Sequence, residues 1–360
     1  MSRNFLRELV NVAEKSANVA RKIREDPVLL ELLIEEKNEV EANPRFIKDF
    51  KTLADVLIQE MIKYDIGKLF PELKSNIKGE ESPIFTNSLG ETVCIEIANS
   101  PEETATCLEV VLNGNKAAAK SLADVVHSEE SFLNEEQVIP EFPEKFDYSK
   151  LGIWIDPIDA TSQYIAGDTI FSNFPGITST GLDCVTVLIG AYDIETGIPI
   201  CGVINQPFCE KIEKQYKSKI FWGICLGDLK TNNLIQEETK RSSKIGLFST
   251  SEHSNIIDTF KDEKYEIAFS AGAGHKALKV ITGEADIYLL SKGTTYKWDT
   301  CAPHAILLSL NGCMYDFQKS LNEKKLIPLT YNSEEDKQNK GGVVAVKDII
   351  LITDLLERLS

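Results

Sequence analysis

Several features that commonly assign a chain to a class are missing from this sequence of 360 residues. No two cysteines form a C-x-x-C pair, and most lie among apolar residues, which favours reduced thiols over disulfides or zinc ligands. No apolar run approaches membrane-spanning length, and the charged start Met1–Glu8 is unlike a secretory leader. We therefore expect a cytoplasmic protein with no membrane partner. The eight cysteines are Cys94, Cys107, Cys184, Cys201, Cys209, Cys225, Cys301 and Cys313.

Basic residues are few relative to acidic ones: 39 Lys and Arg stand against 56 Asp and Glu, a formal net charge of −17. Nucleic acid polymers and anionic membranes bind basic surfaces, so this balance argues against both as partners. It does not argue against a small phosphate compound, because carboxylates loaded with divalent cations present a local positive charge. We expect a monomer that acts on a small molecule.

Hydrophobic periodicity predicts a helical start followed by a β-rich middle. The start predicts two amphipathic helices, over Phe5–Arg24 and Arg45–Ile66. Short runs rich in β-branched residues at 152–155, 183–192 and 199–205 then predict a mostly antiparallel sheet.

A polar segment at 231–244 separates this part from the rest, and we expect an N-terminal domain, 1–238, and a C-terminal domain, 239–360. In the second domain strands alternate with helices, which predicts an α/β half. The predicted strands are 245–248, 267–269 and 285–290, and the predicted helices begin near His275 and Thr300.

The segment Trp154-Ile-Asp-Pro-Ile-Asp-Ala-Thr161 is an apolar run that ends on two carboxylates. Pro157 keeps Asp156 out of the helical region, and the three-residue step to Asp159 lets both carboxylates and the Ile158 carbonyl converge. Such oxygen ligands suit a hard cation like Mg²⁺, which keeps other positions for water and substrate phosphate. Taken alone, the segment is equally compatible with a surface β-turn.

Thr161-Ser-Gln-Tyr-Ile-Ala follows and permits a helix. The first backbone N–H groups of that helix, with Ala160 and Thr161 at its start, would point to the same place as the metal and hold a phosphate oxyanion. The sequence thus predicts a metal site and an anion site within one turn.

Four segments in sequence order resemble the lithium-sensitive, magnesium-dependent phosphomonoesterases of the inositol monophosphatase superfamily. They are Phe50-Lys-Thr-Leu-Ala-Asp-Val-Leu57, Gly79-Glu-Glu81, Asp156-Pro-Ile-Asp-Ala-Thr161 and the K-W-D-T-C-A-P-H-A-I-L segment that starts at Lys297. The resemblance implies a layered αβαβα sandwich, mixing α+β and α/β halves, with the active site between the halves. Ala160 departs from the usual Gly or Ser of the family but keeps its backbone N–H.

The same resemblance implies a site for two or three Mg²⁺ ions, with Li⁺ as an inhibitor. Four carboxylates that converge without cations raise one another's pKa values, so such a cluster is stable near neutral pH mainly with metal bound. The implied metal ligands are Glu80, Glu81, Asp156, the Ile158 carbonyl, Asp159 and Asp299.

Thr161 and Asp55 are similar to the hydroxyl–carboxylate pair that orients and deprotonates the attacking water in the family. No covalent phosphoenzyme is implied, and no histidine is needed as a nucleophile. Two alternatives stay open: Asp55 could face solvent from its helix, and Asp299 could be an N-cap as well as a ligand.

Two loops of the second half are candidates for substrate recognition. Ser270-Ala-Gly-Ala-Gly-His-Lys276 runs into a helix, so its N–H groups could approach an anion and Lys276 could neutralise a phosphate. An ordinary strand-to-helix loop is the alternative interpretation. The predicted substrate contacts are Asp156, Ala160, Thr161, Thr250, Ser251, Glu252, Gly272, Ala273 and Lys276, whereas His275 and His304 are predicted to be structural.

The activity implied by the resemblance is removal of the 1-phosphate from inositol 1,4-bisphosphate, and also from inositol 1,3,4-trisphosphate, by metal-activated water. One alternative is a 3′(2′),5′-bisphosphate nucleotidase, which an aromatic stacking face in the pocket would favour. The other is a non-catalytic regulator that binds inositol phosphates. Retention of Thr161 and Asp55 argues against it, because binding alone needs no water-activating pair.

Overall fold

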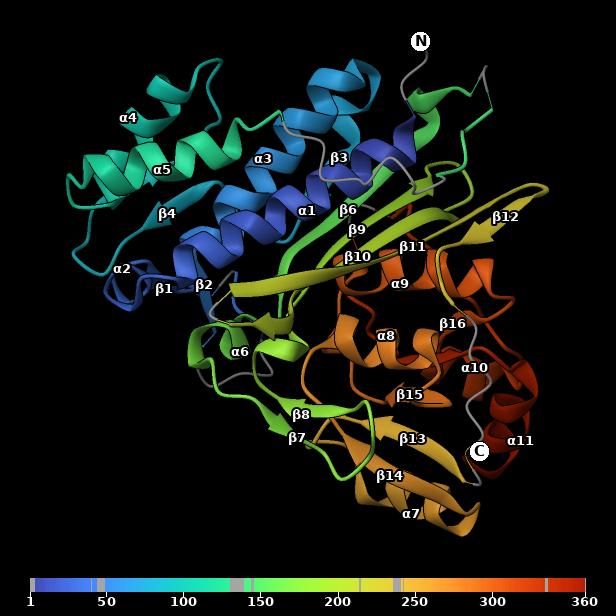
Figure 1. The fold of residues 1–360 in the computed structure, drawn as a ribbon. Coiled ribbons are helices and arrows are strands. Elements are labelled where there is room, and N and C mark those ends of the chain that lie inside the picture. Colours follow the sequence, from blue (N-terminus) through green and yellow to red (C-terminus); the bar gives the residue numbers. More distant parts are fainter. Residues whose placement is uncertain are drawn as a thin grey trace.

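Helices and sheets alternate in five layers through the computed structural model of this protein (Figure 1). It describes residues 4–39, 41–43, 49–129, 139–143, 146–213, 215–235, 241, 243–333 and 336–359. The predicted αβαβα sandwich is confirmed. No helix in these ranges is long and apolar enough to cross a membrane.

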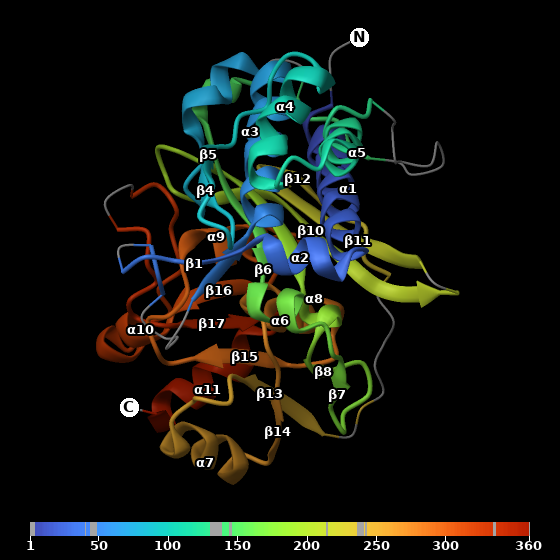
Figure 2. The same ribbon diagram turned by 90° about the vertical axis from the view of Figure 1, so that its left-hand side faces the viewer.

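The first layer is formed by α1 (Phe5–Arg24) and α3 (Leu53–Leu69), which pack on each other and on the first sheet. The Asn4 side chain caps α1 by accepting a hydrogen bond from the Arg7 backbone N–H at 3.1 Å, and the helix buries one apolar face. Figure 2 shows α4 (Pro101–Val111) and α5 (Lys116–Val126) beside this layer. The short elements around it are α2 (Pro27–Leu32), β1 (Ile34–Glu36), β2 (Phe50–Thr52), β4 (Ile84–Thr86) and β5 (Thr92–Cys94).

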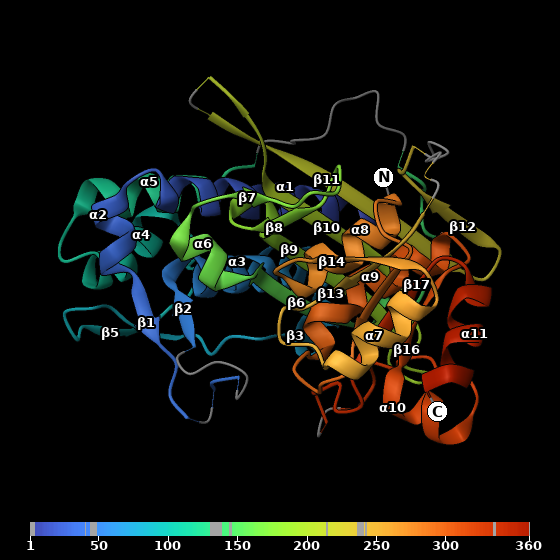
Figure 3. The ribbon, with the colours of Figure 1, turned by 90° about the horizontal axis from the view of Figure 1, so that it is seen from below.

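The second layer is a six-stranded sheet in the order β12-β11-β10-β9-β6-β3, antiparallel except for the parallel pair β3 and β6. β10 and β11 stay paired past Asn205, where β10 stops pairing with β9, and they project from the sheet as a ribbon (Figure 3). The strands are β3 (Ile77–Gly79), β6 (Leu151–Asp159), β9 (Thr186–Asp193), β10 (Pro199–Ile212), β11 (Gln215–Leu226) and β12 (Leu229–Asn232).

The third layer consists of α8 (Ala273–Thr282) and α9 (Lys297–Ser309), which lie between the two sheets. α9 comes very close to the first sheet. A Cβ atom added at Gly202 would lie only 2.2 Å from the carbonyl oxygen of Ala302. Only glycine allows this contact, which draws the second half of the chain onto the first.

The fourth layer is a mixed sheet in the order β14-β13-β15-β17-β16, and the fifth is a set of helices on its outer face. Its strands are β13 (Lys244–Phe248), β14 (Tyr265–Phe269), β15 (Ile287–Leu290), β16 (Cys313–Asp316) and β17 (Val343–Val346). The outer helices are α7 (Ser254–Asp262), α10 (Phe317–Glu323) and α11 (Ile349–Leu359). The small hairpin β7 (Ile170–Phe171) and β8 (Thr178–Thr180) follows α6 (Thr161–Ala166).

Several predicted boundaries differ from the observed ones; the strand predicted over 183–192, for example, begins only at Thr186. The helix predicted over Arg45–Ile66 begins only at Leu53, because the Thr52 side chain accepts from the Ala54 N–H and Asp55 closes the capping box; residues 44–48 lie outside the described ranges. The helix predicted from Thr300 begins at Lys297. The predicted domain boundary at 238 and 239 also falls outside the described residues and stays a prediction.

Candidate active site

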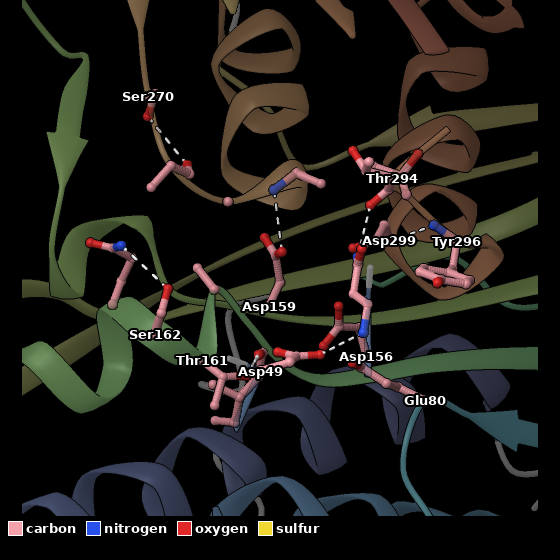
Figure 4. A pocket seen from close by; sticks show the side chains of 18 of the residues that line it. Asp49, Glu80, Asp156, Asp159, Thr161, Ser162, Ser270, Thr294, Tyr296 and Asp299 are labelled. Carbon is pink, nitrogen blue, oxygen red and sulfur yellow. Dashed lines mark hydrogen bonds between the residues drawn. The ribbon is translucent and has the colours of Figure 1, made fainter. Parts of the chain in front are cut away.

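The junction of β6 and α6 forms the centre of a pocket between the two halves of the chain (Figure 4). The register of β6 against β9 shifts between Asp156 and Asp159, and Ala160 then takes a φ of 70° before α6 begins. This left-handed conformation is uncommon for a residue with a Cβ atom. The sharp turn brings Asp156 and residues 158–161 to one pocket, as the sequence predicts, and adds Ser162 and Gln163 to its lining.

Three carboxylates converge in this pocket. Ligand oxygens of Asp156, Asp159 and Asp299 all lie within 4.8 Å of one another. Burial, followed by repulsion from neighbouring carboxylates, holds the pKa values of Asp156 and Asp299 well above their usual range. Asp156 Oδ1 is buried and has no hydrogen-bond partner. This orphaned oxygen and the all-oxygen donor set fit a hard divalent cation.

Glu80 lines the same pocket, whereas Glu81 does not. Both follow β3, and the Gln59 side chain of α3 fixes their backbone by accepting from the Glu81 N–H at 2.8 Å and donating to the Glu81 carbonyl at 2.6 Å. Glu80 is not among the three converging carboxylates, so its role as a ligand stays a prediction. The prediction for Glu81 needs correction, because its carboxylate is buried and turned to a lysine.

That lysine is Lys37, which sequence reasoning missed. Its buried Nζ donates to Glu80 Oε1 at 2.6 Å and forms an ion pair with Glu81 Oε1 at 2.6 Å, outside hydrogen-bond geometry. Burial alone would lower the pKa of Lys37, but Glu80 and Glu81 outweigh it and raise the pKa above its ordinary value. Lys37 therefore stays charged and offsets the negative charge of the two glutamates.

Asp55 and Thr161 meet beside this acidic cluster. Thr161 Oγ1 lies 3.2 Å from Asp55 Oδ1 and 3.0 Å from the Ile158 carbonyl oxygen. Asp55 is 1% exposed, which rules out the solvent-facing alternative, and its Oδ2 accepts from the Thr52 N–H at 2.7 Å. Burial raises the pKa of Asp55 to about 6, against the opposing effects of Thr52 and Lys37.

Asp299 is the third residue of α9, so it caps the helix from inside its first turn rather than from the N-cap position. Its carboxylate accepts from the Tyr296 backbone N–H at 2.5 Å. Tyr296 and Trp298 also line the pocket, and their rings stack on each other with centroids 4.6 Å apart. Asp299 thus serves both as a cap and as a candidate ligand.

The loop before α8, residues 270–273, also lines the pocket. The sequence predicts that its N–H groups hold a substrate anion, but the structure gives them to Asp159. The N–H of Ala273 donates to Asp159 Oδ1 at 3.2 Å and that of Gly274 to Oδ2 at 2.8 Å. Gly272 has a φ of 75°, and an added Cβ would lie 2.8 Å from the Cys184 carbonyl oxygen. Gly272 and Ala273 do line the pocket, as predicted.

Lys276 needs a second correction. It is 2% exposed and absent from the pocket lining, and its Nζ donates to the Gly272 carbonyl at 2.6 Å and the Ser270 carbonyl at 3.3 Å. The ammonium group therefore holds the loop from behind instead of reaching a phosphate. Its charge opposes the effect of burial on the pKa of Asp159, which is nevertheless raised.

Only one of the other predicted substrate contacts lies in the pocket lining. Thr250 lines the pocket, whereas Ser251 and Glu252 do not. The Glu252 carboxylate accepts from the Ser291 backbone N–H at 2.9 Å and from the Ser291 hydroxyl. Its role is to join two loops.

His275 and His304 are fully buried and lie away from the pocket lining. Burial lowers the pKa of both, that of His304 to about 3, so they stay neutral. This agrees with the predicted structural role.

The pocket has a volume of about 270 Å³ and contains residues that no motif indicated. Asn43 joins both halves, since its Nδ2 donates to the Thr294 carbonyl at 3.1 Å while its N–H donates to Asp49 at 2.9 Å. Only tertiary structure brings such loops together. The lining residues missed from the sequence are Asn43, Asp49, Phe50, Ser162, Gln163, Ser179, Thr180, Ser270, Ala271, Thr294, Thr295, Tyr296 and Trp298.

The sequence of this chain is similar to those of known phosphatases. Residues 58–348 match the family described as the inositol monophosphatase family. The inositol polyphosphate 1-phosphatase of Homo sapiens is 41% identical over 96% of this chain and 94% of its own length. The 3′(2′),5′-bisphosphate nucleotidase 1 of Rattus norvegicus is 28% identical over 82% of this chain and 79% of its own.

Solved structures show the same fold at low sequence identity. The IMPase of Thermotoga maritima has a TM-score of 0.53 and 13% identity, covering 98% of this chain and 96% of its own. The extragenic suppressor protein suhB of Bartonella henselae has a TM-score of 0.54 and 14% identity, covering 99% and 98%.

Proposed function

The chain belongs to the inositol monophosphatase family, and on that basis we propose that it is a Mg²⁺-dependent phosphomonoesterase acting on inositol phosphates. The substrate we propose is inositol 1,4-bisphosphate, from which the 1-phosphate is removed, with inositol 1,3,4-trisphosphate as a second substrate. The 41% identity to an inositol polyphosphate 1-phosphatase over nearly both full lengths supports this choice.

One observation carries the proposal: the Thr161 hydroxyl lies 3.2 Å from Asp55, directly beside three converging aspartates. A regulator that only binds an inositol phosphate would need ligands for the cation and phosphate. It would not need a buried carboxylate with a raised pKa behind a hydroxyl. The pair therefore favours catalysis over simple binding.

In the proposed reaction, one group of residues would hold the metal ions and another would activate the water. Glu80, Asp156, Asp159, Asp299 and the Ile158 carbonyl would hold two or three Mg²⁺ ions, which when bound neutralise the phosphate and lower the pKa of a nearby water.

Thr161 would accept a hydrogen bond from that water, and Asp55 would take up the proton through the Thr161 hydroxyl. The backbone at Ala160 and Thr161 would face the phosphate. Li⁺ at millimolar concentration is proposed as an inhibitor, uncompetitive with respect to substrate.

A 3′(2′),5′-bisphosphate nucleotidase is the second candidate, because Phe50, Tyr296 and Trp298 line the pocket and aromatic faces can stack on a base. Part of this aromatic surface is already used, since the Tyr296 and Trp298 rings stack on each other.

The experiment is a phosphate-release assay that compares kcat/KM for inositol 1,4-bisphosphate, inositol 1-phosphate and adenosine 3′,5′-bisphosphate in Mg²⁺. We expect inositol 1,4-bisphosphate to have the highest value, by tenfold or more over inositol 1-phosphate. A higher value for the adenosine compound would replace the proposed substrate and leave the metal site in place. Absence of release from all three would refute the phosphatase proposal.

A further inference from the structure

Two cysteines from different elements lie next to each other outside the active-site pocket. Cys94 is the last residue of β5, and Cys107 lies in α4, which packs against that strand. The Cys107 thiol donates a hydrogen bond to the Cys94 carbonyl oxygen, with 3.6 Å between sulfur and oxygen. Neither residue lines the pocket, so their chemistry is separate from the proposed reaction.

The connection from β5 to α4 holds the two residues opposite each other. The Thr104 hydroxyl accepts a hydrogen bond from the Ala98 backbone N–H at 3.0 Å, which ties the first turn of α4 to the chain just beyond β5. Ile95 is fully buried, and consecutive residues of an extended chain point to opposite sides, so Cys94 points away from the core. Cys94 is exposed and Cys107 is half-buried. The pair therefore lies where a small oxidant in solution can reach it.

The other cysteines lack this combination of exposure and contact. Four of them are buried, and buried structural thiols are inert toward oxidants in solution. Two more are half-buried, but within the described ranges neither forms a hydrogen bond with another cysteine. The buried residues are Cys184, Cys201, Cys301 and Cys313, and the half-buried ones are Cys209 and Cys225.

The surroundings of the pair keep it reduced when no oxidant is added. Partial burial, followed by the charges of Glu96 and Glu60 and by the neighbouring Cys107 thiol, raises the pKa of Cys94. The thiolate is the reactive form, so a raised pKa slows oxidation at neutral pH.

We propose that Cys94 and Cys107 form a site of reversible oxidation, at which a hydroperoxide converts the two thiols into a disulfide that joins β5 to α4. The exposed Cys94 thiolate attacks the peroxide: an S–O bond forms, the O–O bond breaks, and the leaving oxygen takes up a proton. The Cys107 sulfur loses its proton to solvent and attacks the sulfenic acid of Cys94, so that the S–S bond forms, the S–O bond breaks and water leaves. Two thiols are oxidised by two electrons in total, and one hydroperoxide is reduced.

The disulfide would act on stability. It closes the short segment 94–107 and restricts the unfolded chain, which raises the free energy of unfolding. This inference does not depend on the proposed substrate, because both cysteines lie outside the pocket lining.

The test is treatment of the folded, reduced protein with hydrogen peroxide, followed by alkylation of the remaining thiols and cleavage after glutamate without reductant. Glu96, Glu102 and Glu103 lie between the two cysteines, so the disulfide joins peptide 92–96 to peptide 104–109. We expect this joined species in the mass spectrum, lighter by two hydrogen atoms than the separate peptides together. Dithiothreitol should separate it, and the oxidised protein should melt several degrees above the reduced one.

Cys94→Ser should abolish both the joined peptides and the rise in melting temperature, and should leave Cys107 open to alkylation. Cys107→Ser should give the same result from the other side of the pair. Cys225→Ser is the matched control, because it also removes one partly accessible thiol, but on β11. The joined peptides should still form in this variant.

Peroxide-treated protein in which both thiols are alkylated, or in which they are oxidised separately to sulfinic acids, would overturn this inference. A bond from Cys94 to a different cysteine would do the same. So would joining that occurs in urea-unfolded protein but not in the folded protein.

Discussion

Thr161 and Asp55 form the smallest unit of the site whose chemical role can be tested separately by mutation. Thr161→Ala and Asp55→Asn should each lower kcat far more than they raise KM, because a water-activating pair acts mainly in the transition state. Their effects should not add, since each residue works through the 3.2 Å contact with the other. A double variant that loses the full sum of the two penalties would contradict the pairing. Thr106→Ala on an exposed turn of α4 is the control.

The pH profile of kcat/KM follows from Asp55. Its pKa is raised to about 6, and the residue must be deprotonated to take up a proton from water. Activity should therefore rise about tenfold per pH unit below the apparent pKa and level off above it. Bound cations favour the carboxylate, so the midpoint should lie at or below pH 6. The rise in kcat/KM between acidic and neutral pH should disappear in Asp55→Asn. If it persists in that variant, the titration belongs to another group.

Sequence and structure agree on residues whose role follows from local spacing, such as Asp156 and Asp159. They disagree where a role depends on tertiary partners. The small-residue loop before it predicts Lys276 in the pocket, but the ammonium group donates to the carbonyl of Gly272 in that same loop. Lys37 lies in an ordinary charged stretch, and nothing local indicates that it will be buried between Glu80 and Glu81.

The loop before α8 offers a prediction at the scale of the element. Gly272→Ala places a Cβ 2.8 Å from the Cys184 carbonyl oxygen and 3.0 Å from Asp159 Oδ2, in a conformation with positive φ. We expect a loss of roughly 1–3 kcal/mol in the free energy of unfolding, measured by urea denaturation, and a higher Mg²⁺ concentration for half-maximal activity.

Gly227→Ala separates the cost of backbone strain at positive φ from the cost of placing a Cβ against Asp159 and Cys184. Gly227 also has a positive φ, of 56°, but nothing lies within 4 Å of an added Cβ. It should lose only about 1 kcal/mol from backbone strain and keep the normal Mg²⁺ response. If both variants behave alike, contact with Asp159 is not what makes Gly272 necessary.

Elements with strong hydrophobic periodicity were predictable, and their ends were less so. Apolar spacing runs from Phe46 through Ile62, yet α3 starts only at Leu53, because the Thr52 and Asp55 side chains satisfy the first backbone N–H groups. The β6–turn–α6 unit was predictable in outline, as an apolar strand, two carboxylates and a helix from Thr161, but its local sequence alone is equally compatible with a surface β-turn, and the left-handed conformation of Ala160 was not predicted. The pocket-lining residues of β8, Ser179 and Thr180, were not predictable, because they reach the pocket only through tertiary packing.

For the whole molecule, the acidic cluster links stability to pH and metal. The pKa values of Asp55, Asp156 and Asp299 are higher in the folded chain than in the unfolded one, so the folded state binds more protons. In EDTA the free energy of unfolding should therefore fall as pH rises, beginning near pH 4 and passing through pH 6 for Asp55.

Mg²⁺ should reverse this loss at pH 8, since a ligand bound only by the folded state stabilises it. The measurement is urea unfolding at pH 5 and pH 8, with and without Mg²⁺. Asp156→Asn should flatten the pH dependence in EDTA. Stability that rises with pH in EDTA would contradict the raised pKa values.

The most direct test of the metal-dependent mechanism is phosphate release from inositol 1,4-bisphosphate by metal-stripped protein titrated with Mg²⁺, compared with Asp156→Asn. We predict no release in EDTA and full recovery in Mg²⁺. We also predict a loss in kcat of a thousandfold or more in the variant, on the order of 4 kcal/mol of transition-state stabilisation. Undiminished release in EDTA, or a fully active Asp156→Asn protein that still folds, would contradict it.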